Sequence, residues 1–430
     1  MLSENLNSPT GLNLGVQGAK PPAGCWGSAP AAGVGAQPSK GFTFLREVDR
    51  KPSLGMMSVP TPINHKEGGF MATSARYDTI AARLSAALPE LRTHLCTSLA
   101  CVLTGMSQAV SAQQRAVAAA MPLLTQQASK IQRFRRLLDN ERLTAEGVYR
   151  PIVRAALTGL RGQRVHVLLD RVVLTDTQNV LVVSLGFRRR SIPLVWAILT
   201  HSGSSSLADQ QEVLTAAVAL LPPAVRIVVQ ADSEFRSQTL FGWVRAQGWD
   251  AILGIRGNIL VSTKAHQPGQ ALTNWLPDRD SVAYLNAVWL TDDHHGPVNV
   301  LAWWDKNDRG VLTCYAIMTN LAATWQTYRV GSRRMWIETL FRDGQSGGFA
   351  LGTSAITDPG RFHRLILLVC LVYLWFLSVG RWLVKRGYRT VIDAGAAHAW
   401  HLSLFTLAVA WQHRLRTFEQ PMPVFWYLYC

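Results

Sequence analysis

Acidic residues are scarce in this sequence of 430 residues. Only 27 Asp and Glu stand against 43 Lys and Arg, so the formal net charge is +16. The sequence pI is about 10.1. A basic excess of this size argues against an acidic, solvating protein and favours a polyanionic partner, with nucleic acid as the first candidate.

Cysteine is also rare. The six cysteines are scattered and form no C-x-x-C pair, which argues against a zinc site or a disulfide framework. This usage fits a reducing cytosol. The sequence does not open with a basic segment followed by an apolar run, so we expect no secretory signal and a cytoplasmic location.

Long uncharged apolar runs are almost absent. The one that needs a decision is Leu365 to Gly380, and its 16 residues fall short of the roughly 18 expected for a membrane span. We interpret it as a buried core helix and expect no membrane partner. An integral membrane protein stays as a weaker alternative.

A chain of this length has room for two or three domains. Residues 1–70 are rich in Gly, Pro and Ala and sustain no helical or strand period, so we predict a disordered tail. Residues 72–162 have a helical pattern throughout, with prolines where helices should begin or end.

One stretch of this helical region, 130–140, carries a basic stripe. Its apolar residues form one face, while Lys130, Arg133 and Arg136 point outward together. A solvated basic face is the usual outcome of such a pattern. With the net charge considered, a contact with the DNA backbone is at least as well supported.

From residue 163 the pattern changes to strands and helices that alternate, which predicts a mixed α/β fold. The expected strands cover 165–170, 180–187, 192–199, 225–232 and 251–255, and those over 165–170 and 225–232 end in an acid. The runs 180–187 and 192–199, separated by Arg188-Arg189-Arg190-Ser191, suggest an antiparallel hairpin. Residues 163–256 form the first part of the α/β fold. Residues 257–311 break the alternation with short β-like pieces, so we predict a β-rich insertion. Residues 312–380 complete the unit, and 381–430 are expected to be a helical C-terminal segment.

Three acidic residues have positions that suggest a shared site. Asp170 and Asp232 lie at or near the ends of predicted central strands, where ligands bind in α/β sheets. Glu338 lies on a predicted helix. Three converging carboxylates without His or Cys favour hard divalent ions such as Mg²⁺ or Mn²⁺. Two such ions would activate the attacking oxygen and stabilise the leaving oxygen in phosphoryl transfer.

The charged residues of the helix that carries Glu338 have two possible interpretations. Arg334 and Arg342 each lie four residues from Glu338, so the arginines could form two ordinary exposed ion pairs, each worth about 0.3–0.5 kcal/mol. Alternatively, Glu338 is a metal ligand and the arginines hold phosphates.

Several local sequences, taken together, resemble the DDE transposases of bacterial insertion sequences. They are Leu168-Leu169-Asp170, Gln230-Ala231-Asp232-Ser233-Glu234-Phe235, Tyr315-Ala-Ile-Met-Thr-Asn320, and Arg334-Met-Trp-Ile-Glu338-Thr-Leu-Phe-Arg342-Asp343 followed by Ser346-Gly-Gly-Phe349. The resemblance covers roughly 72–380. It is closest to the branch that has a β-strand insertion before its catalytic Glu, and a spacing of 106 residues between Asp232 and Glu338 leaves room for that insertion.

The resemblance implies an RNase-H-like catalytic core with Asp170, Asp232 and Glu338 as catalytic and metal-binding residues. It implies two divalent ions, hydrolysis of DNA at transposon ends and attack of the freed 3′-hydroxyl on target DNA. The 133–140 segment looks like the helical DNA-binding domain of the same family. The implied partner is double-stranded DNA, bound by a homodimer near the nucleoid of a bacterial cell.

This branch has a Tyr-Arg-Glu-Lys signature around its catalytic Glu, which the sequence matches only in part. Arg334 stands at the Arg position, but Gly331 stands where Tyr is expected and Gln345 where Lys is expected. The family Arg and Lys contact DNA, so Gln345 should lose one charged contact, for which Arg342 could compensate. A DNA-binding protein derived from a transposase, with a defective catalytic site, is therefore the main alternative function.

Overall fold

The computed structural model describes Gly15–Val16 and residues 68–428, apart from 176–177, 200–202, 277, 291–294, 308, 346, 394–401, 419 and 421. Most of the predicted tail over 1–70 lies outside these residues. Within it, Gly15–Val16 forms the short strand β1, which pairs with β9 (Val282–Leu290). The first helix begins at Gly68.

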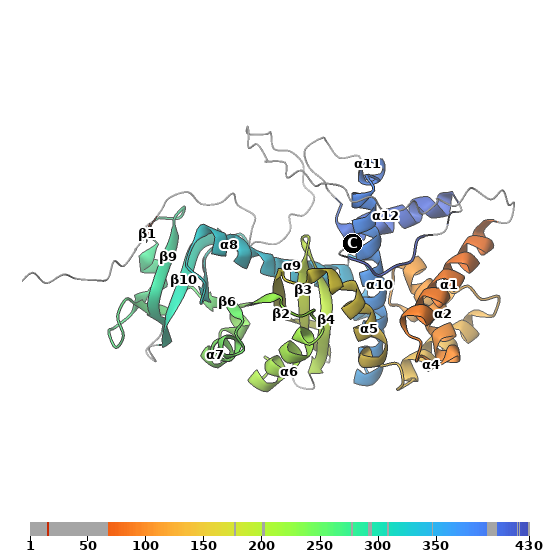
Figure 1. Ribbon diagram of the computed structural model, residues 1–430, viewed down its shortest axis with the longest axis horizontal. Helices are drawn as coiled ribbons and strands as arrows, with labels where there is room; N and C mark the ends of the chain where they lie inside the picture. Colours follow the sequence, from red (N-terminus) through yellow and green to blue (C-terminus); the bar gives the residue numbers. More distant parts are fainter. Residues whose placement is uncertain are drawn as a thin grey trace, which may run out of the picture.

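Most of the region predicted to be helical forms a bundle at one end of the molecule (Figure 1). Its helices are α1 (Gly68–Ala87), α2 (Thr93–Ala109), α3 (Gln114–Ala119) and α4 (Gln127–Asp139). Leu99 and Phe134 are completely buried between them, because the apolar residues of each helix recur at helical spacing and face inward. Helix α5 (Arg150–Ala156) lies apart from the bundle, beside the sheet and α10 (Figure 1).

The rest of the chain is built on one mixed sheet of eleven strands, in the order β4-β3-β2-β5-β6-β11-β10-β9-β7-β8, with β1 beside β9. The strands are β2 (Arg164–Thr175), β3 (Gln178–Phe187), β4 (Arg190–Leu199), β5 (Arg226–Ala231), β6 (Asp250–Arg256), β7 (Leu260–Ser262), β8 (Gln270–Ala271), β10 (His295–Lys306) and β11 (Leu312–Thr319). The fold is thus mixed α/β, as expected.

Two of the sheet's pairings are parallel, and they lie at its centre. β5 pairs with β2 on one side and with β6 on the other. The helices α6 (Leu207–Val218) and α7 (Gln238–Ala246) make these parallel connections and lie on the same side of the sheet (Figure 1). Parallel strands need such crossover helices because a short turn cannot connect them.

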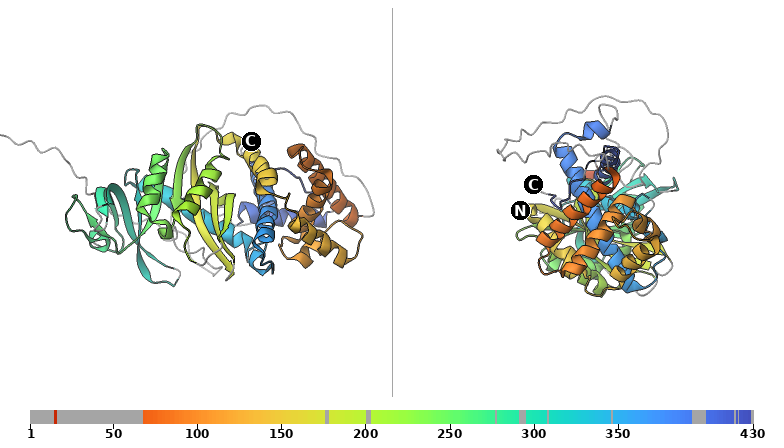
Figure 2. Two further views of the ribbon diagram at one scale, coloured as in Figure 1. Left: turned by 90° about the horizontal axis from the view of Figure 1, so that it is seen from below. Right: turned by 90° about the vertical axis from the view of Figure 1, so that its right-hand side faces the viewer.

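The residues of the expected β-rich insertion extend the same sheet. β11 pairs antiparallel with β6, and β10 and β9 follow in antiparallel order. Figure 2 shows these strands continuing from the central ones. The return of residues 312–318 to the main sheet agrees with the sequence expectation. The sequence did not predict that β10 and β9 continue the same sheet, because an edge strand can accept a partner from any part of the chain.

Two sequence expectations for the first strands have different outcomes. The hairpin is present: β3 and β4 pair antiparallel around the turn Arg188–Arg189, whose φ angles are +47° and +64°. Two positive φ values are typical of the tight turn that suits twisted strands. In contrast, β2 does not end at Asp170. It continues to Thr175, because residues 171–173 pair with β3.

After β11 the chain continues with α8 (Trp325–Gly331), α9 (Met335–Gly344) and α10 (Pro359–Lys385). In the described residues, α10 alone is long and apolar enough to cross a membrane, yet 89% of its most apolar window is buried inside the protein. Asp358 caps its first turn. These features agree with the interpretation of the 365–380 run as a core helix.

The C-terminal segment packs back onto α10 and the bundle. It contains the end of α10, α11 (Arg389–Ile392) and α12 (Leu404–Thr417), while residues 422–428 are not helical. Gln412 on α12 donates to the Ser107 carbonyl at 2.7 Å and accepts from Arg76 at 3.0 Å. Arg361 of α10 pairs with Asp139 of α4. Helix α10 therefore connects the bundle with the sheet (Figure 1).

Candidate active site at the sheet rim

The sheet register places Asp170 and Asp232 side by side. Leu169 on β2 lies next to Ala231 on β5 in the parallel pairing, so the residues that follow each of them occupy neighbouring positions. Adjacent strands are about 4.8 Å apart, and side chains at neighbouring positions point to the same face. The two carboxylates therefore reach the same edge of the sheet.

A glycine permits the turn that carries Asp232. A Cβ atom at Gly254 on β6 would lie 2.6 Å from the backbone nitrogen of Ser233 and 2.9 Å from the carbonyl carbon of Asp232. Real side chains do not tolerate such contacts with backbone atoms. The chain after β5 can therefore cross β6 closely only because residue 254 is Gly.

Helix α9 brings Glu338 to the same edge. Ile337 is completely buried against the sheet, and the Trp336 ring packs over Gly186 on β3, where a Cβ atom would lie 3.2 Å from the ring. This contact fixes the helix across β2, β3 and β4. Glu338, the residue after Ile337, then faces the strand ends next to the two aspartates.

The guanidinium of Arg334 lies between the three carboxylates. Its Nη1 is 3.5 Å from Oδ2 of Asp170 and 3.5 Å from Oδ2 of Asp232. Its Nη2 is 3.0 Å from Oε1 of Glu338. The structure thus brings together the three predicted acids and one of the predicted DNA-binding residues, and the cation at their centre is an arginine.

Burial makes it costly to keep the side chains of this cluster charged. The side chains of Asp170 and Arg334 are only 13% and 10% exposed. Burial raises the pKa of Asp170 to about 7, although the Arg334 charge opposes this rise. Burial alone would lower the pKa of Arg334, but Asp232, Asp170 and Glu338 outweigh it and raise that pKa. A carboxylate so poorly solvated stays charged only beside a cation.

The donor chemistry of this cluster fits a divalent ion. Three carboxylates without nitrogen or sulfur ligands are typical of Mg²⁺ and Mn²⁺ sites, and here all three already surround one positive charge. Among the described residues, however, no group of three or more His, Cys, Asp or Glu side chains is spaced to hold a metal ion. We attribute this spacing to the guanidinium that separates the carboxylates.

A cleft of about 290 Å³ opens beside the cluster. Asp232, Arg334 and Glu338 form one wall, while Trp303 and Tyr315, from β10 and β11, form part of another. The indole of Trp303 stacks on the Tyr315 ring, with centroids 6.2 Å apart. The strands of the β-rich insertion therefore help to enclose the site.

A buried polar network lies one layer deeper on the same elements. Arg333 donates to Nε2 of His166, and Nδ1 of His166 is 3.1 Å from Nε2 of Gln230. Gln230 also donates to the Val330 carbonyl at 3.1 Å. Burial, aided by the charges of Arg333 and Arg164, lowers the pKa of His166 to about 3, so the ring is neutral at pH 7. This network ties β2 and β5 to α8 and to the turn Ser332–Arg334 that precedes α9.

Two further ion pairs hold the elements that carry the acids. Arg171 forms a two-pronged contact with Glu234, at 2.6 and 2.9 Å, and links the strand of Asp170 to the turn of Asp232. Arg190 on β4 lies 3.1 Å from Asp343 on α9, and both side chains are almost fully buried. The sequence analysis predicted neither pair, because each partner is distant in the chain.

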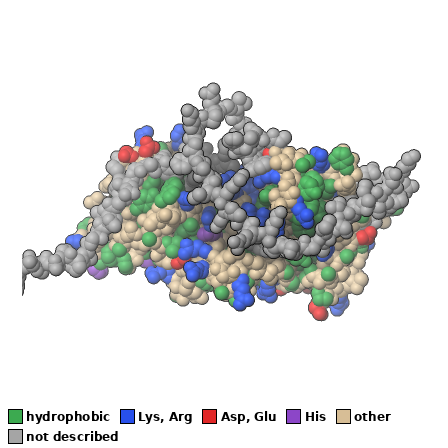
Figure 3. All heavy atoms as spheres, turned by 45° about the horizontal axis from the view of Figure 1, so that its top comes forward, with side chains coloured by type: hydrophobic (Ala, Val, Ile, Leu, Met, Phe, Trp, Pro, Cys, Tyr) green, Lys and Arg blue, Asp and Glu red, His purple; other side chains and the backbone are tan. Residues whose placement is uncertain are grey.

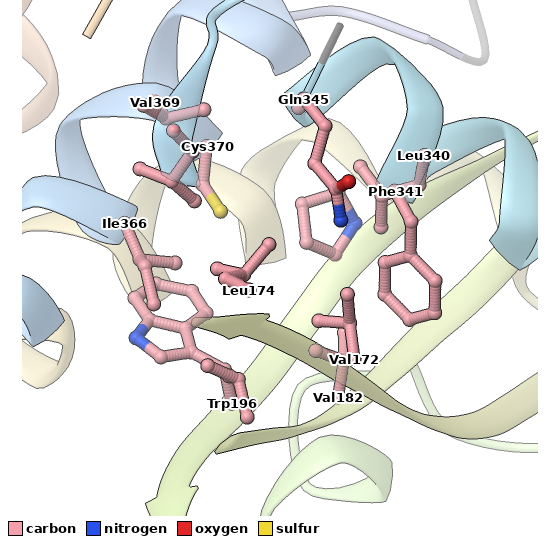
Figure 4. A pocket seen from close by; sticks show the side chains of 14 residues that line it. Val172, Leu174, Val182, Trp196, Leu340, Phe341, Gln345, Ile366, Val369 and Cys370 are labelled. Carbon is pink, nitrogen blue, oxygen red and sulfur yellow. The ribbon is translucent and has the colours of Figure 1, made fainter. Parts of the chain in front are cut away.

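The other predicted DNA-binding residues of α9 have different surroundings. Arg342 is exposed. Gln345 instead lines an apolar pocket behind α9, together with Leu340, Phe341 and Cys370. Figure 4 shows its carboxamide directed into this pocket. In this conformation Gln345 therefore does not face the acidic cluster.

The basic residues of α4 lie away from the three acids, in the bundle beyond α10 (Figure 1). Arg133 and Arg136 line a groove between α2 and α4 that also contains the hydroxyls of Thr97 and Ser129. Lys130 donates to the Met121 carbonyl at 3.3 Å. Figure 3 shows further Lys and Arg side chains spread over one face of the molecule.

The family comparison agrees with this arrangement. Residues 162–375 match the family model of the transposase DDE domain, so the chain carries such a domain from β2 into α10. This domain implies an RNase-H-like core and suggests a transposase function. Its family is typically catalytic, its members generally use divalent metal ions, and transposases bind DNA. A comparison with curated proteins found no match.

Proposed function

We propose that this protein is a transposase that cuts DNA at the ends of a mobile element and joins the freed ends to target DNA. Asp170, Asp232 and Glu338 are the proposed catalytic residues and the ligands of two Mg²⁺ or Mn²⁺ ions. The observation that carries this proposal is their convergence, from β2, β5 and α9, on one buried cation within the transposase DDE domain.

The chemistry divides between the ions and the chain. When bound, two divalent ions would activate the attacking oxygen and stabilise the leaving oxygen. The carboxylates hold the site, while Ile337 and the Trp336–Gly186 contact keep Glu338 at a fixed position on the sheet. In the cut, an oxygen of water bonds to phosphorus, the bond to the 3′ oxygen breaks, and that oxygen takes up a proton. The freed 3′-hydroxyl then gives up its proton and bonds to a phosphorus of the target, the bond from that phosphorus to the target's 3′ oxygen breaks, and this leaving oxygen takes up a proton.

Binding of double-stranded DNA is assigned to two groups of residues. Arg342 and Arg334 flank Glu338 at the site, and Lys130, Arg133 and Arg136 extend the basic surface to α4. The net charge of +16 supports a long DNA contact. We further propose that two copies act on two DNA ends in the bacterial cytoplasm, and that the chain belongs to the branch with a β insertion before its catalytic Glu.

The test is strand cleavage of DNA that carries the gene's own flanking ends. Intact protein, Glu338→Ala and Glu212→Ala are compared with Mg²⁺, with Mn²⁺ and with EDTA. Glu212 is an exposed glutamate of α6 and serves as the matched control. We expect the intact protein and Glu212→Ala to cut only with metal, and Glu338→Ala not to cut.

The alternative function is DNA binding without cleavage, and the position of Gln345 favours it. The family has a Lys there, whereas the Gln345 side chain points into an apolar pocket. If intact protein and Glu338→Ala both bind the ends and neither cuts them, the alternative replaces the enzyme. Binding should then still weaken steeply with salt, because it depends on phosphate contacts.

A further inference from the structure

Arg334 occupies the position that the proposed divalent ions need. Its guanidinium contacts one oxygen of each of the three carboxylates, at 3.0 to 3.5 Å. Mg²⁺ binds carboxylate oxygens at about 2.0–2.1 Å and demands near-octahedral geometry. The three acids cannot close around a metal ion at these distances while the guanidinium remains between them.

The same contacts make Arg334 necessary when no metal is bound. Without it, Asp170, Asp232 and Glu338 would form a cluster of like charges, and Asp170 is buried. Like charges at one site repel and are costly to ionise together. One guanidinium offsets only one of three negative charges, so the cluster keeps an excess of negative charge that still attracts a divalent ion.

We propose that Arg334 is an internal counterion that competes with divalent metal for the three carboxylates. In the metal-free protein it holds the acids in place, and on metal binding it turns away from them. The cleft of about 290 Å³, which Arg334 lines, gives the side chain room to turn. Its backbone lies in the short 3₁₀ turn Ser332–Arg334 between α8 and α9. This inference rests on the proposed metal-dependent function.

A consequence is that metal and DNA should promote each other's binding. A DNA phosphate in the cleft would attract the guanidinium and release the acids for metal. Linkage requires that metal then raise DNA affinity by the same factor. Loss of the Arg334 charge should remove this coupling, because no internal cation remains to be displaced.

The experiment is Mn²⁺ binding to the full chain without DNA, measured from the free-ion electron paramagnetic resonance signal. We compare intact protein, Arg334→Gln, Arg334→Lys and Arg329→Gln. Arg329 is exposed on α8, and among the described residues it forms no ion pair with the three acids. Its replacement therefore removes one nearby charge and serves as the control.

We expect Arg334→Gln to bind Mn²⁺ about tenfold more tightly than intact protein, within the range usual for coupled sites. Arg334→Lys should fall between the two. Arg329→Gln should differ from intact protein by no more than about twofold, because exposed charges are screened. Equal or weaker Mn²⁺ binding by a folded Arg334→Gln protein would overturn the proposal.

Two additional measurements separate the possible failures. Glu338→Gln should weaken Mn²⁺ binding in every background. If it does not, the acids are not the metal site and the proposed function fails; if it does, and Arg334→Gln still shows no tightening, only the present inference fails. Thermal unfolding in EDTA should show a lower Tm for Arg334→Gln than for intact protein, and Mn²⁺ should remove most of this difference. A purely structural role would leave the difference unchanged with metal.

Discussion

Helix α9 has a buried arginine–carboxylate contact at each end, and the two contacts differ in composition. At its start, Arg334 meets three carboxylates, two of which, Asp232 and Glu338, are 46% and 41% exposed. Near its end, Arg190 meets the single carboxylate of Asp343, whose side chain is 5% exposed. Tyr373 lies 3.4 Å from the same carboxylate.

The difference distinguishes a candidate metal-binding site from an ion pair that only stabilises the fold. At Asp343 the charges balance one to one, and removal of either partner leaves an unpaired charge in the protein interior. Around Arg334 the negative charge is in excess and opens to a cleft. Such an imbalance is unfavourable for stability alone, and it is typical of sites that await another cation.

The largest expected effects come from replacing Asp by Asn in the carboxylate contact at each end of α9. Asp170→Asn should abolish cleavage, with a loss of about 10³-fold or more, as when one member of a cooperating catalytic set is removed. It should cost the metal-free protein little stability, since Arg334 keeps its contacts with Asp232 and Glu338. Strand cleavage and urea unfolding measure the two effects.

Asp343→Asn should instead lower the stability of the protein. Breaking a buried pair typically costs about 3–5 kcal/mol, and metal should not restore this loss. The control is Asp139→Asn, which breaks the pair with Arg361 between side chains that are 42% and 51% exposed and should cost at most about 1 kcal/mol. If Asp170→Asn destabilises the protein as much as Asp343→Asn does, the distinction between the two ends is wrong.

The second prediction concerns the pH dependence of stability. The folded protein keeps His166 neutral with a pKa near 3, against an ordinary value of 6.5. Between these values the unfolded chain binds a proton that the folded chain does not. The contribution of His166 to the unfolding free energy should therefore fall as pH falls through this window, by up to about 1.4 kcal/mol per pH unit. Asp170, whose pKa is raised to about 7, contributes a slope of the opposite sign.

His166→Gln should remove the contribution of His166 from the measured slope, because it removes the titrating ring and keeps an acceptor for Arg333. Urea unfolding at a series of pH values measures the slope. His413 on α12, exposed to solvent, gives the matched control, and His413→Gln should leave the slope nearly unchanged. An identical slope in His166→Gln would contradict the assignment.

The third prediction tests how closely the backbone must pack near Asp232. Gly254→Ala forces a Cβ atom against the Ser233 backbone, so it should cost about 1–3 kcal/mol of stability and reduce cleavage by displacing Asp232. Gly242 in α7 has no atom within 4 Å of the added Cβ. Gly242→Ala should instead stabilise the protein by about 0.5–1 kcal/mol. Thermal unfolding and cleavage distinguish the two variants.

The smallest expected effect concerns Gln345. Gln345→Leu places an apolar side chain in an apolar pocket and should raise the unfolding free energy by roughly 1 kcal/mol. The affinity for DNA should not change, because the carboxamide does not point toward the acid cluster. A weaker affinity for DNA in a folded Gln345→Leu protein would instead place Gln345 in the DNA contact.

Much of the α/β order was predictable because its signals are local. The hairpin followed from two apolar runs around an arginine-rich turn, and the three acids followed from short sequences around Asp170, Asp232 and Glu338. The length of β2 was not predictable. Asp170 and Arg171 are charged, and only the pairing with β3 and the contact from Arg171 to Glu234 continue the strand beyond them.

The contacts of Arg334 with all three acids could not be predicted from the sequence either. Its spacing from Glu338 predicted an ion pair on one helix, and the 3.0 Å contact bears this out. The two aspartates come from strands more than 100 residues earlier in the chain. Only the sheet register places them next to the same guanidinium. Long-range pairings of this kind leave no periodic signal.

The unbroken hydrogen bonding of the sheet limits how this molecule can deform. The strands that carry Asp170 and Asp232 join, through β6 and β11, the strands that carry Trp303 and Tyr315. The part of the cleft that the strands form therefore moves as one unit, because spreading these strands would break several ladder bonds at once. The opposite part lies on α9, which Ile337 and Trp336 hold against the same sheet. Adjustment to a bulky substrate then falls on the side chains that line the cleft, Arg334 among them.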